Sequence, residues 1–223
     1  MKIKNKLLKT YLDAISRLTK EPCIEINAAG MTTVAVDPAH VAIVKAHIPK
    51  SADLEITEEV RVSIDADKTK KYLSSFGPND TLDISFDDGK MTISSGGLKF
   101  KSGLLAESQF PKVPNLTLLS YGTISVKDLK SVKNTSISDN IRFSVSGNSF
   151  IVLAQNDSDE IEVQNRTECS KDAKATYPAD YVSNALMGEN LKIEFGNDLP
   201  CRIFPDVEGM ELMFLVAPRI END

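Results

Sequence analysis

Residues 30–48 read GMTTVAVDPAHVAIVKAHI, with apolar residues alternating with small or polar ones before and after an Asp-Pro-Ala-His break. An alternation of period two predicts β-strands that bury one face, and an Asp-Pro pair is typical of a turn. The stretch therefore predicts an antiparallel hairpin with His40 at its corner.

The strand that opens this hairpin recurs later in the chain. The segment CIEINAAGMTTVAV (23–36) aligns with NIRFSVSGNSFIVL (140–153), and their apolar positions coincide. In the same way LDISF (82–86) matches LKIEF (191–195). Similar segments repeated in the same order indicate a duplicated structural unit. We therefore predict two domains with one architecture.

Apolar residues at helical spacing mark four other segments. These predicted helices cover residues 2–20, 66–76 behind Asp65 as N-cap, 125–134 with Ser125 and Asp128 as a capping-box pattern, and 178–188 with Pro178 in the first turn. Further period-two strands are predicted at 60–64, 82–86, 91–93, 98–100, 161–163 and 212–216. Each copy thus reads helix, strands, helix, strands, so the predicted class is α+β with antiparallel sheets.

The segment LAESQFPKVPNLTLL (105–119) has neither period and contains Pro111 and Pro114. Proline disfavours helix at the residue before it and removes a backbone donor, so an extended connector is expected. The predicted organisation is a first domain over 1–104, a connector over 105–118 and a second domain over 119–223.

The charge balance gives mixed signals about a nucleic-acid partner. The net charge is −6, whereas affinity for phosphates comes mainly from lysine and arginine. The first twenty residues are the exception, because they carry a local net positive charge. Asp13 is their one acidic residue, and the basic residues are Lys2, Lys4, Lys6, Lys9, Arg17 and Lys20. A solvated lysine-rich helix face is the plain alternative.

Other composition features exclude several classes of protein. The 3 cysteines show no C-x-x-C spacing, which argues against a disulfide scaffold or a zinc site. The longest apolar run, 212–217, is far too short to span a membrane, so a soluble protein is expected.

Candidate catalytic groups are few. His40 and His47 are the 2 histidines, and no nucleophile or metal-ligating cluster accompanies them. An enzyme using the acidic pairs Asp87 and Asp88, or Asp157 and Asp159, is a rival hypothesis, but such acids near glycine or serine are more typical of turns. We predict no enzymatic activity, no cofactor and no metal.

Three stretches together, GMTTVAVDPAHVAIVKAHI, GNDLPCRIF (196–204) and LMFLVAPRIEND (212–223), resemble the sliding DNA clamps of the proliferating cell nuclear antigen (PCNA) family. The resemblance covers essentially the whole chain. It implies a homotrimeric ring whose helices line a central hole, and double-stranded DNA bound without regard to sequence. It also implies an ATP-driven clamp loader of the replication factor C type, and DNA polymerase, flap endonuclease and DNA ligase as partners. An archaeal-type clamp is expected in the cytoplasm with the nucleoid, and a eukaryotic one in the nucleus.

In that ring the helices would face the phosphates. The resemblance and the charge pattern together predict the DNA-facing residues Lys6, Lys9, Arg17, Lys20, Lys68, Lys71, Lys127, Lys130 and Lys133. The fourth helical segment has no basic residue, so its contribution to DNA binding is expected to be small.

The family also has a groove that receives partner peptides carrying a glutamine, an aliphatic residue and two aromatics. The positions that match this groove are Val36, His40, Val41, Ile43, Val113, Pro114, Leu199, Pro200, Leu215, Val216, Ala217 and Pro218. For Ile43, Leu215 and Val216, ordinary strand core remains an equal alternative.

Ring closure in the family uses two edge strands, which match LKFKSGL (98–104) and DEIEVQN (159–165). Side chains alternate along a strand, so two lysines share one face of the first and two glutamates one face of the second. The predicted subunit interface comprises Leu98, Lys99, Phe100 and Lys101 with Glu160, Ile161, Glu162 and Val163. Alternating charge on a solvated strand is the competing interpretation.

A clamp-like scaffold that does not load onto DNA, or a subunit of a mixed ring, is the alternative function of the chain.

Overall fold

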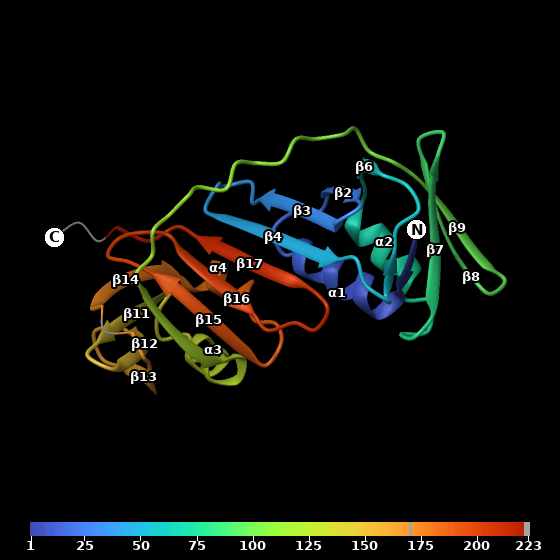
Figure 1. The fold of residues 1–223 in the computed structure, drawn as a ribbon. Coiled ribbons are helices and arrows are strands. Elements are labelled where there is room, and N and C mark those ends of the chain that lie inside the picture. Colours follow the sequence, from blue (N-terminus) through green and yellow to red (C-terminus); the bar gives the residue numbers. More distant parts are fainter. Residues whose placement is uncertain (170, 221–223) are drawn as a thin grey trace. The chain divides into compact units, whose positions relative to one another are not determined.

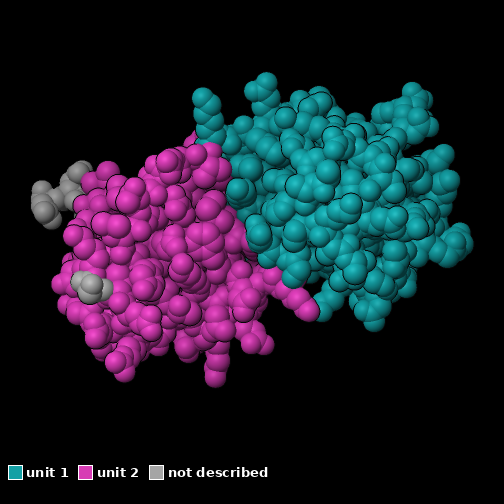
Figure 2. Space-filling model, in the orientation of Figure 1, with its two compact units in different colours: residues 1–38, 44–112, 209–211 teal, residues 39–43, 113–208, 212–223 magenta. Residues whose placement is uncertain are grey.

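The computed structural model describes residues 1–169 and 171–220. The chain divides into two compact units (Figure 2). Unit 1 comprises residues 1–38, 44–112 and 209–211, and unit 2 comprises 39–43, 113–208 and 212–223. Each unit therefore contains a short piece from the other half of the sequence. The domain boundaries given above stay a prediction.

Unit 1 contains two antiparallel sheets and two helices (Figure 1). One sheet has the strand order β5-β1-β7-β8-β9 and the other contains β4-β3-β2-β6. The elements are β1 Lys2–Lys4, α1 Asn5–Ile15, β2 Cys23–Asn27, β3 Gly30–Val36, β4 Ala42–Pro49, β5 Leu54–Glu55, β6 Val60–Ser63, α2 Ala66–Leu73, β7 Thr81–Asp87, β8 Lys90–Ser95 and β9 Leu98–Gly103.

Unit 2 repeats this order of elements, which confirms the duplication and the α+β class. Its sheets have the orders β10-β15-β16-β17 and β13-β12-β11-β14. The elements are β10 Ser120–Ser125, α3 Val126–Asn134, β11 Asn140–Ser146, β12 Ser149–Gln155, β13 Glu160–Arg166, β14 Ala173–Pro178, α4 Ala179–Ser183, β15 Asn190–Phe195, β16 Cys201–Pro205 and β17 Glu211–Val216.

The predicted bounds of three helices were wrong. Residues 2–4 form strand β1, and α1 ends at Ile15, because Ser16 takes the C-cap and donates its N–H to Leu12 O (2.9 Å). Helix α2 ends at Leu73, before the predicted 76. Helix α4 is a single short turn whose N-cap, outside the helix, is Pro178. At the start of α1, the pairing of β1 with β5 and β7 overrides the helical apolar spacing, whereas the C-terminal ends of the three helices pass into turns.

Local capping and turn signals were confirmed. The Asp65 carboxylate accepts the Lys68 N–H at 2.8 Å, and the Ser125 hydroxyl oxygen accepts the Asp128 N–H at 3.0 Å. Asp88 (φ 46°) and Gly89 (φ 68°) both adopt left-handed conformations in the β7–β8 hairpin, as a two-residue hairpin turn requires. Asp88 therefore has a structural role in this turn.

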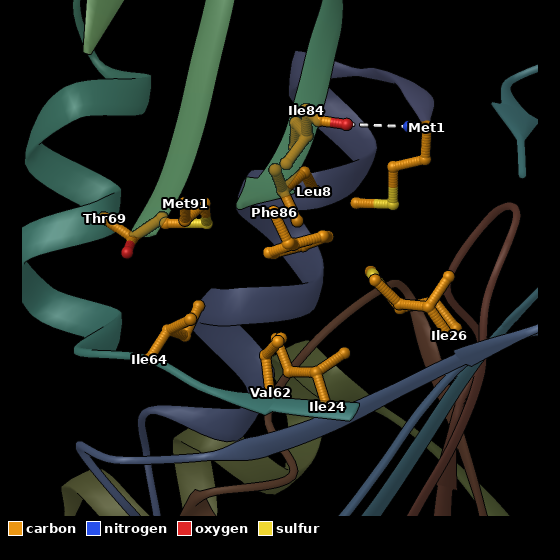
Figure 3. A pocket seen from close by; sticks show the side chains of 11 residues that line it. Met1, Leu8, Ile24, Ile26, Val62, Ile64, Thr69, Ile84, Phe86 and Met91 are labelled. Atoms are coloured by element: carbon orange, nitrogen blue, oxygen red, sulfur yellow. Dashed lines mark hydrogen bonds between the residues drawn. The ribbon is translucent and has the colours of Figure 1, made fainter. Parts of the chain in front are cut away.

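Apolar side chains from both sheets and from α1 fill the interior of unit 1. A small gap of about 20 Å³ remains there, lined by residues that include Met1, Leu8, Phe86 and Met91 (Figure 3). The Met1 ammonium beside it donates to Ile84 O at 2.7 Å. Because the lining is apolar, the gap offers a water too few polar partners and is an imperfection of packing.

The connector is extended, as its prolines predict: residues 106–119 form neither helix nor strand. In unit 1, the Arg61 guanidinium holds its first part, with Nε 3.3 Å from Glu107 Oε1 and the group stacked 4.6 Å from the centre of the Phe110 ring. None of the helices within the described residues is long and apolar enough to cross a membrane.

Candidate DNA-binding faces, peptide groove and ring edges

Helix α1 presents two lysines to solvent in unit 1. Leu8, Tyr11 and Leu12 are buried, whereas Lys6 and Lys9 are exposed on the opposite side of the helix. An open hollow of about 220 Å³ lies beside them, lined also by Asp13, Ser74 and Pro78 among others. Lys6 and Lys9 give the hollow two ammonium groups against one carboxylate, which suits contact with phosphates.

The other predicted basic residues of unit 1 are also exposed, although not all are helical. Lys68 and Lys71 lie on α2, while Arg17 and Lys20 follow the end of α1. Lys70, also on α2, makes polar contacts within unit 1. Its ammonium lies 3.6 Å from Asp13 Oδ1 and 3.4 Å from Asp67 Oδ1, and donates to Ser16 Oγ at 2.7 Å.

In unit 2, Lys127 and Lys130 lie one turn apart on α3 and are exposed. Lys133 is half-buried, and its ammonium lies 3.6 Å from Asp180 Oδ1 on α4. The sequence prediction treated these three lysines alike. The structure separates Lys133, because a neighbouring carboxylate already neutralises part of its charge.

These faces can bind phosphates without selecting a base sequence. Exposed ammonium groups on flexible stems act as point charges, whereas base recognition uses planar, bidentate side chains held in a groove. Among the described residues, no group of three or more His, Cys, Asp or Glu side chains could hold a metal ion.

Most of the predicted groove residues come together within unit 2. They lie on the segment 39–43, the connector at 113–114, the loop at 196–200 and the end of β17 with the chain after it. The Ala217 N–H donates to Val41 O (2.9 Å) and joins the last of these segments to the first, and Arg202 Nη2 on β16 donates to Leu116 O of the connector (2.9 Å). Val36 belongs to unit 1 and is half-buried.

Exposure within the groove set is graded. Val113 and Leu199 are 36% and 39% exposed, respectively, and are among the more exposed large apolar side chains. Along with them, His40, Val41, Ile43, Pro114, Pro200, Ala217 and Pro218 are half-buried or exposed. The set thus offers partly exposed apolar side chains, with the exposed imidazole of His40 among them.

The two neighbouring residues on β17 separate in the structure. Leu215 pairs with Arg202 and Val216 with Cys201, so their side chains point to opposite faces of the sheet. Val216 lies on the core side and is fully buried (0% exposed). Val216 is a core residue and does not face a peptide. Leu215 lies on the opposite face of the sheet but is also buried (5% exposed), as the strand-core alternative expects.

The hairpin corner is as the sequence predicted. His40 has a φ of 57° and an exposed side chain, which is the left-handed conformation of a turn residue. The rival acidic pair Asp157 and Asp159 also lies in a turn, where Asn156 Oδ1 accepts the N–H groups of Ser158 and Asp159, each at 2.8 Å. The Asn156 side chain therefore holds this turn, and the two acids are turn residues.

Sequence reasoning missed Arg202 as a part of the groove. On the outer face of β16, its guanidinium lies 3.8 Å from Glu194 Oε2 and holds the connector through Leu116. A lone arginine inside the apolar run LPCRIF was the available signal, since a charged residue in a strand usually has a specific partner.

The two predicted ring edges are terminal strands of their sheets, β9 in unit 1 and β13 in unit 2. Lys99 and Lys101 are exposed on one face of β9. On the other face the Phe100 ring stacks on Tyr72, with centroids 4.7 Å apart. Leu98, at the start of β9, is 40% exposed. On β13, the exposed Glu160 and Glu162 alternate with the half-buried Ile161 and Val163. Terminal strands carry unpaired backbone groups that another chain can bind.

Comparisons with known proteins cover the chain from end to end. Residues 2–96 match the family model for the N-terminal domain of proliferating cell nuclear antigen. The DNA polymerase sliding clamp of Picrophilus torridus is 31% identical over 250 residues, covering 100% of this chain and 99% of that protein. That of Thermoplasma acidophilum is 27% identical, covering 100% and 98%.

Solved structures agree. A. fulgidus PCNA, determined with the C-terminal region of FEN-1 bound, superposes with a TM-score of 0.90 at 26% identity, covering 100% of this chain and 98% of that one. The PCNA2–PCNA3 complex from Sulfolobus tokodaii, at 19% identity, shares the fold with a TM-score of 0.84.

Proposed function

The chain belongs to the proliferating cell nuclear antigen family of DNA polymerase sliding clamps, and we propose that it acts as one, with three copies closing around duplex DNA. The observation that carries the proposal is the duplicated fold whose helices bear exposed lysines, in a chain related to sliding clamps over its whole length. A ring of three copies would hold six similar units, with the helices turned toward the DNA.

The charge distribution supports loose capture of DNA. The chain carries a net charge of −6, yet its predicted DNA-facing side chains are all lysine or arginine. Scattered ammonium groups attract phosphates regardless of sequence, so no single position along the duplex is preferred. A clamp that must slide needs this weak, uniform attraction, because base contacts would stop it.

The groove in unit 2 would tether DNA polymerase, flap endonuclease and DNA ligase through short peptides. Exposed apolar side chains of the groove would receive the aromatic anchors of such a peptide, and the exposed backbone beside them would pair with its flanks. The structural similarity to a PCNA bound to FEN-1 supports the endonuclease as one such partner. The clamp has no catalytic activity of its own and requires a loader of the replication factor C type. A protein that encircles DNA would be found with the chromosome, in the cytoplasm for an archaeal-type clamp and in the nucleus for a eukaryotic one.

The decisive experiment compares DNA templates. With an archaeal replication factor C and ATP, the protein should remain on covalently circular DNA and slide off linear DNA with open ends. It should also lengthen the products of a polymerase on primed circles. Equal retention on both templates, or no effect on product length, would reject topological capture and favour a scaffold that does not load.

Removing two lysines of α3 should weaken DNA binding in a way that depends on salt. Lys127→Ala with Lys130→Ala removes two exposed ammonium groups without disturbing the buried residues Leu129 and Val132. Each lost phosphate contact should make the plot of log affinity against log salt shallower by about 1. Equilibrium binding to a short duplex at several salt concentrations measures this slope.

The matched control for this pair is Lys45→Ala with Lys50→Ala. These exposed lysines lie on and just after β4, outside the predicted DNA-facing set, and the charge change is the same. The control should keep the parent slope. Equal losses in both variants would show that the overall charge, rather than the α3 face, attracts DNA.

A further inference from the structure

Strand β14 holds two segments of the proposed groove at once. Along this strand, which is the last of its sheet, the Lys174 N–H donates to Asn197 Oδ1 (2.8 Å) and Thr176 O accepts the Arg219 N–H (2.7 Å). At the residue after Thr176, the Tyr177 hydroxyl donates to Leu199 O at 2.8 Å. The loop at 196–200 and the chain after β17 are therefore both fastened to β14.

Tyr177 differs from the backbone contacts because it reaches the loop from the core. Its side chain is fully buried (0% exposed), and its ring packs against Phe143 with centroids 5.3 Å apart. Burial raises the pKa of Tyr177 well above its usual value, so the hydroxyl stays protonated and remains a donor. A buried hydroxyl without a partner is costly, which favours the loop conformation that supplies Leu199 O.

The Tyr177 hydrogen bond acts on a turn. Asp198 has a φ of 53°, a left-handed turn conformation that is uncommon for residues other than glycine and that aspartate adopts more readily than most. Leu199 follows directly, and its side chain is 39% exposed toward solvent. An unsupported loop would sample other conformations and would have to be ordered on binding, at a cost in affinity.

We propose that Tyr177 is a positioning residue of the peptide groove: its hydroxyl holds the carbonyl of Leu199, and so presents the Leu199–Pro200 wall in the shape that accepts a partner peptide. The inference rests on the proposed function, since it concerns the same groove. Tyr177 itself does not contact the peptide.

The test substitutes Tyr177→Phe, which retains the ring and removes the hydroxyl. The chain offers a matched control in Tyr11→Phe, because Tyr11 is equally buried and donates to Thr33 Oγ1 at 2.7 Å in unit 1, where neither residue belongs to the groove. The probe is a fluorescein-labelled peptide with the glutamine, aliphatic and two-aromatic motif, measured by anisotropy. Thermal unfolding and light scattering are recorded on the same samples.

Both variants should lose a similar, small amount of thermal stability, because each removes one buried hydrogen bond. Only Tyr177→Phe should weaken peptide binding, by about five- to tenfold, the effect expected from one neutral hydrogen bond. Assembly and DNA binding should match the parent in both. In a Leu199→Ala background, Tyr177→Phe should add little further loss, because both changes act on one wall.

Three results would overturn the proposal. If Tyr177→Phe binds the peptide with the parent affinity, Tyr177 has no positioning role. If Tyr11→Phe weakens peptide binding equally, the loss of affinity comes from general destabilisation of the fold. If the losses in peptide-binding free energy are fully additive in the variant that combines Tyr177→Phe with Leu199→Ala, Tyr177 acts on the peptide through a part of the groove other than Leu199. If the parent protein itself fails to bind the peptide, the groove function fails with it, whereas a failure of the inference alone leaves the parent affinity intact.

Discussion

A chain carrying Lys99→Glu and Lys101→Glu together is expected to run as a monomer where the parent assembles into a ring. Both lysines are exposed on one face of the terminal strand β9, and Glu160 and Glu162 are exposed in the same alternating manner on the terminal strand β13. In the proposed junction these charges attract. The double substitution places acidic side chains on both strands.

The size of this effect follows from exposed ion pairs. Each is worth about 0–1 kcal/mol, and reversal replaces attraction by repulsion, so about 2 kcal/mol is lost at every junction. That is about thirtyfold in the association constant of one junction, and a closed ring requires all of its junctions. The backbone ladder and the apolar side chains, including Phe100, supply the remaining affinity.

Light scattering across a range of protein concentrations measures the assembly, and loading onto circular DNA should be lost in parallel. The informative control adds Glu160→Lys and Glu162→Lys to the same chain, which restores opposite charges and should restore the ring. A second control, Lys45→Glu with Lys50→Glu, has the same charge change outside the edge strands. An unchanged ring in the first variant, or no rescue in the fourfold variant, would refute the proposed charge pairing.

Val113→Glu with Leu199→Glu is expected to abolish peptide binding while leaving the ring intact. The two side chains stand on different segments of the groove, at 36% and 39% exposed, so the fold tolerates charge there. Within a bound complex, however, each carboxylate would be dehydrated against apolar anchors. The lost contacts and the buried charges together should weaken the peptide at least about a hundredfold.

The chain offers a close control in Leu105→Glu with Leu119→Glu. These leucines are also exposed, at 36% and 58%, and lie outside the groove set. The same peptide anisotropy assay should give the parent affinity for this control. For the groove variant, rings should still load on circular DNA, but a polymerase that depends on the peptide should make short products. Peptide affinity within tenfold of the parent would remove these residues from the groove.

The patterns that the sequence predicted well act over a few residues. The N-caps Asp65 and Ser125 were read from residue type and spacing, because a cap bonds to a backbone group three positions along. The Asp88–Gly89 turn was readable for the same reason. Period-two alternation indicated the strands and the duplication indicated the second unit, since both patterns repeat along the chain itself.

Helix ends and weak elements were harder to predict. Residues 2–4 share the apolar spacing of the helix that follows, yet β1 pairs with β5 and β7, which are distant in sequence. The strand β10 was missed in the same way, because its pairing with β15 spans most of unit 2. Backbone pairing across such distances outweighs local propensity in short segments.

The same distinction between local pattern and long-range contact applies to the site residues. The amino-acid sequence by itself determined which residues are basic, which strands alternate and which family the chain resembles, because these are properties of residue type and order. Only the tertiary structure decided that Asp180 lies beside Lys133, that Val216 and Leu215 are both buried on opposite faces of one sheet, and that Tyr177 holds Leu199. Each of these depends on the direction of a side chain relative to a distant partner, and that direction is set by how the sheets and helices pack.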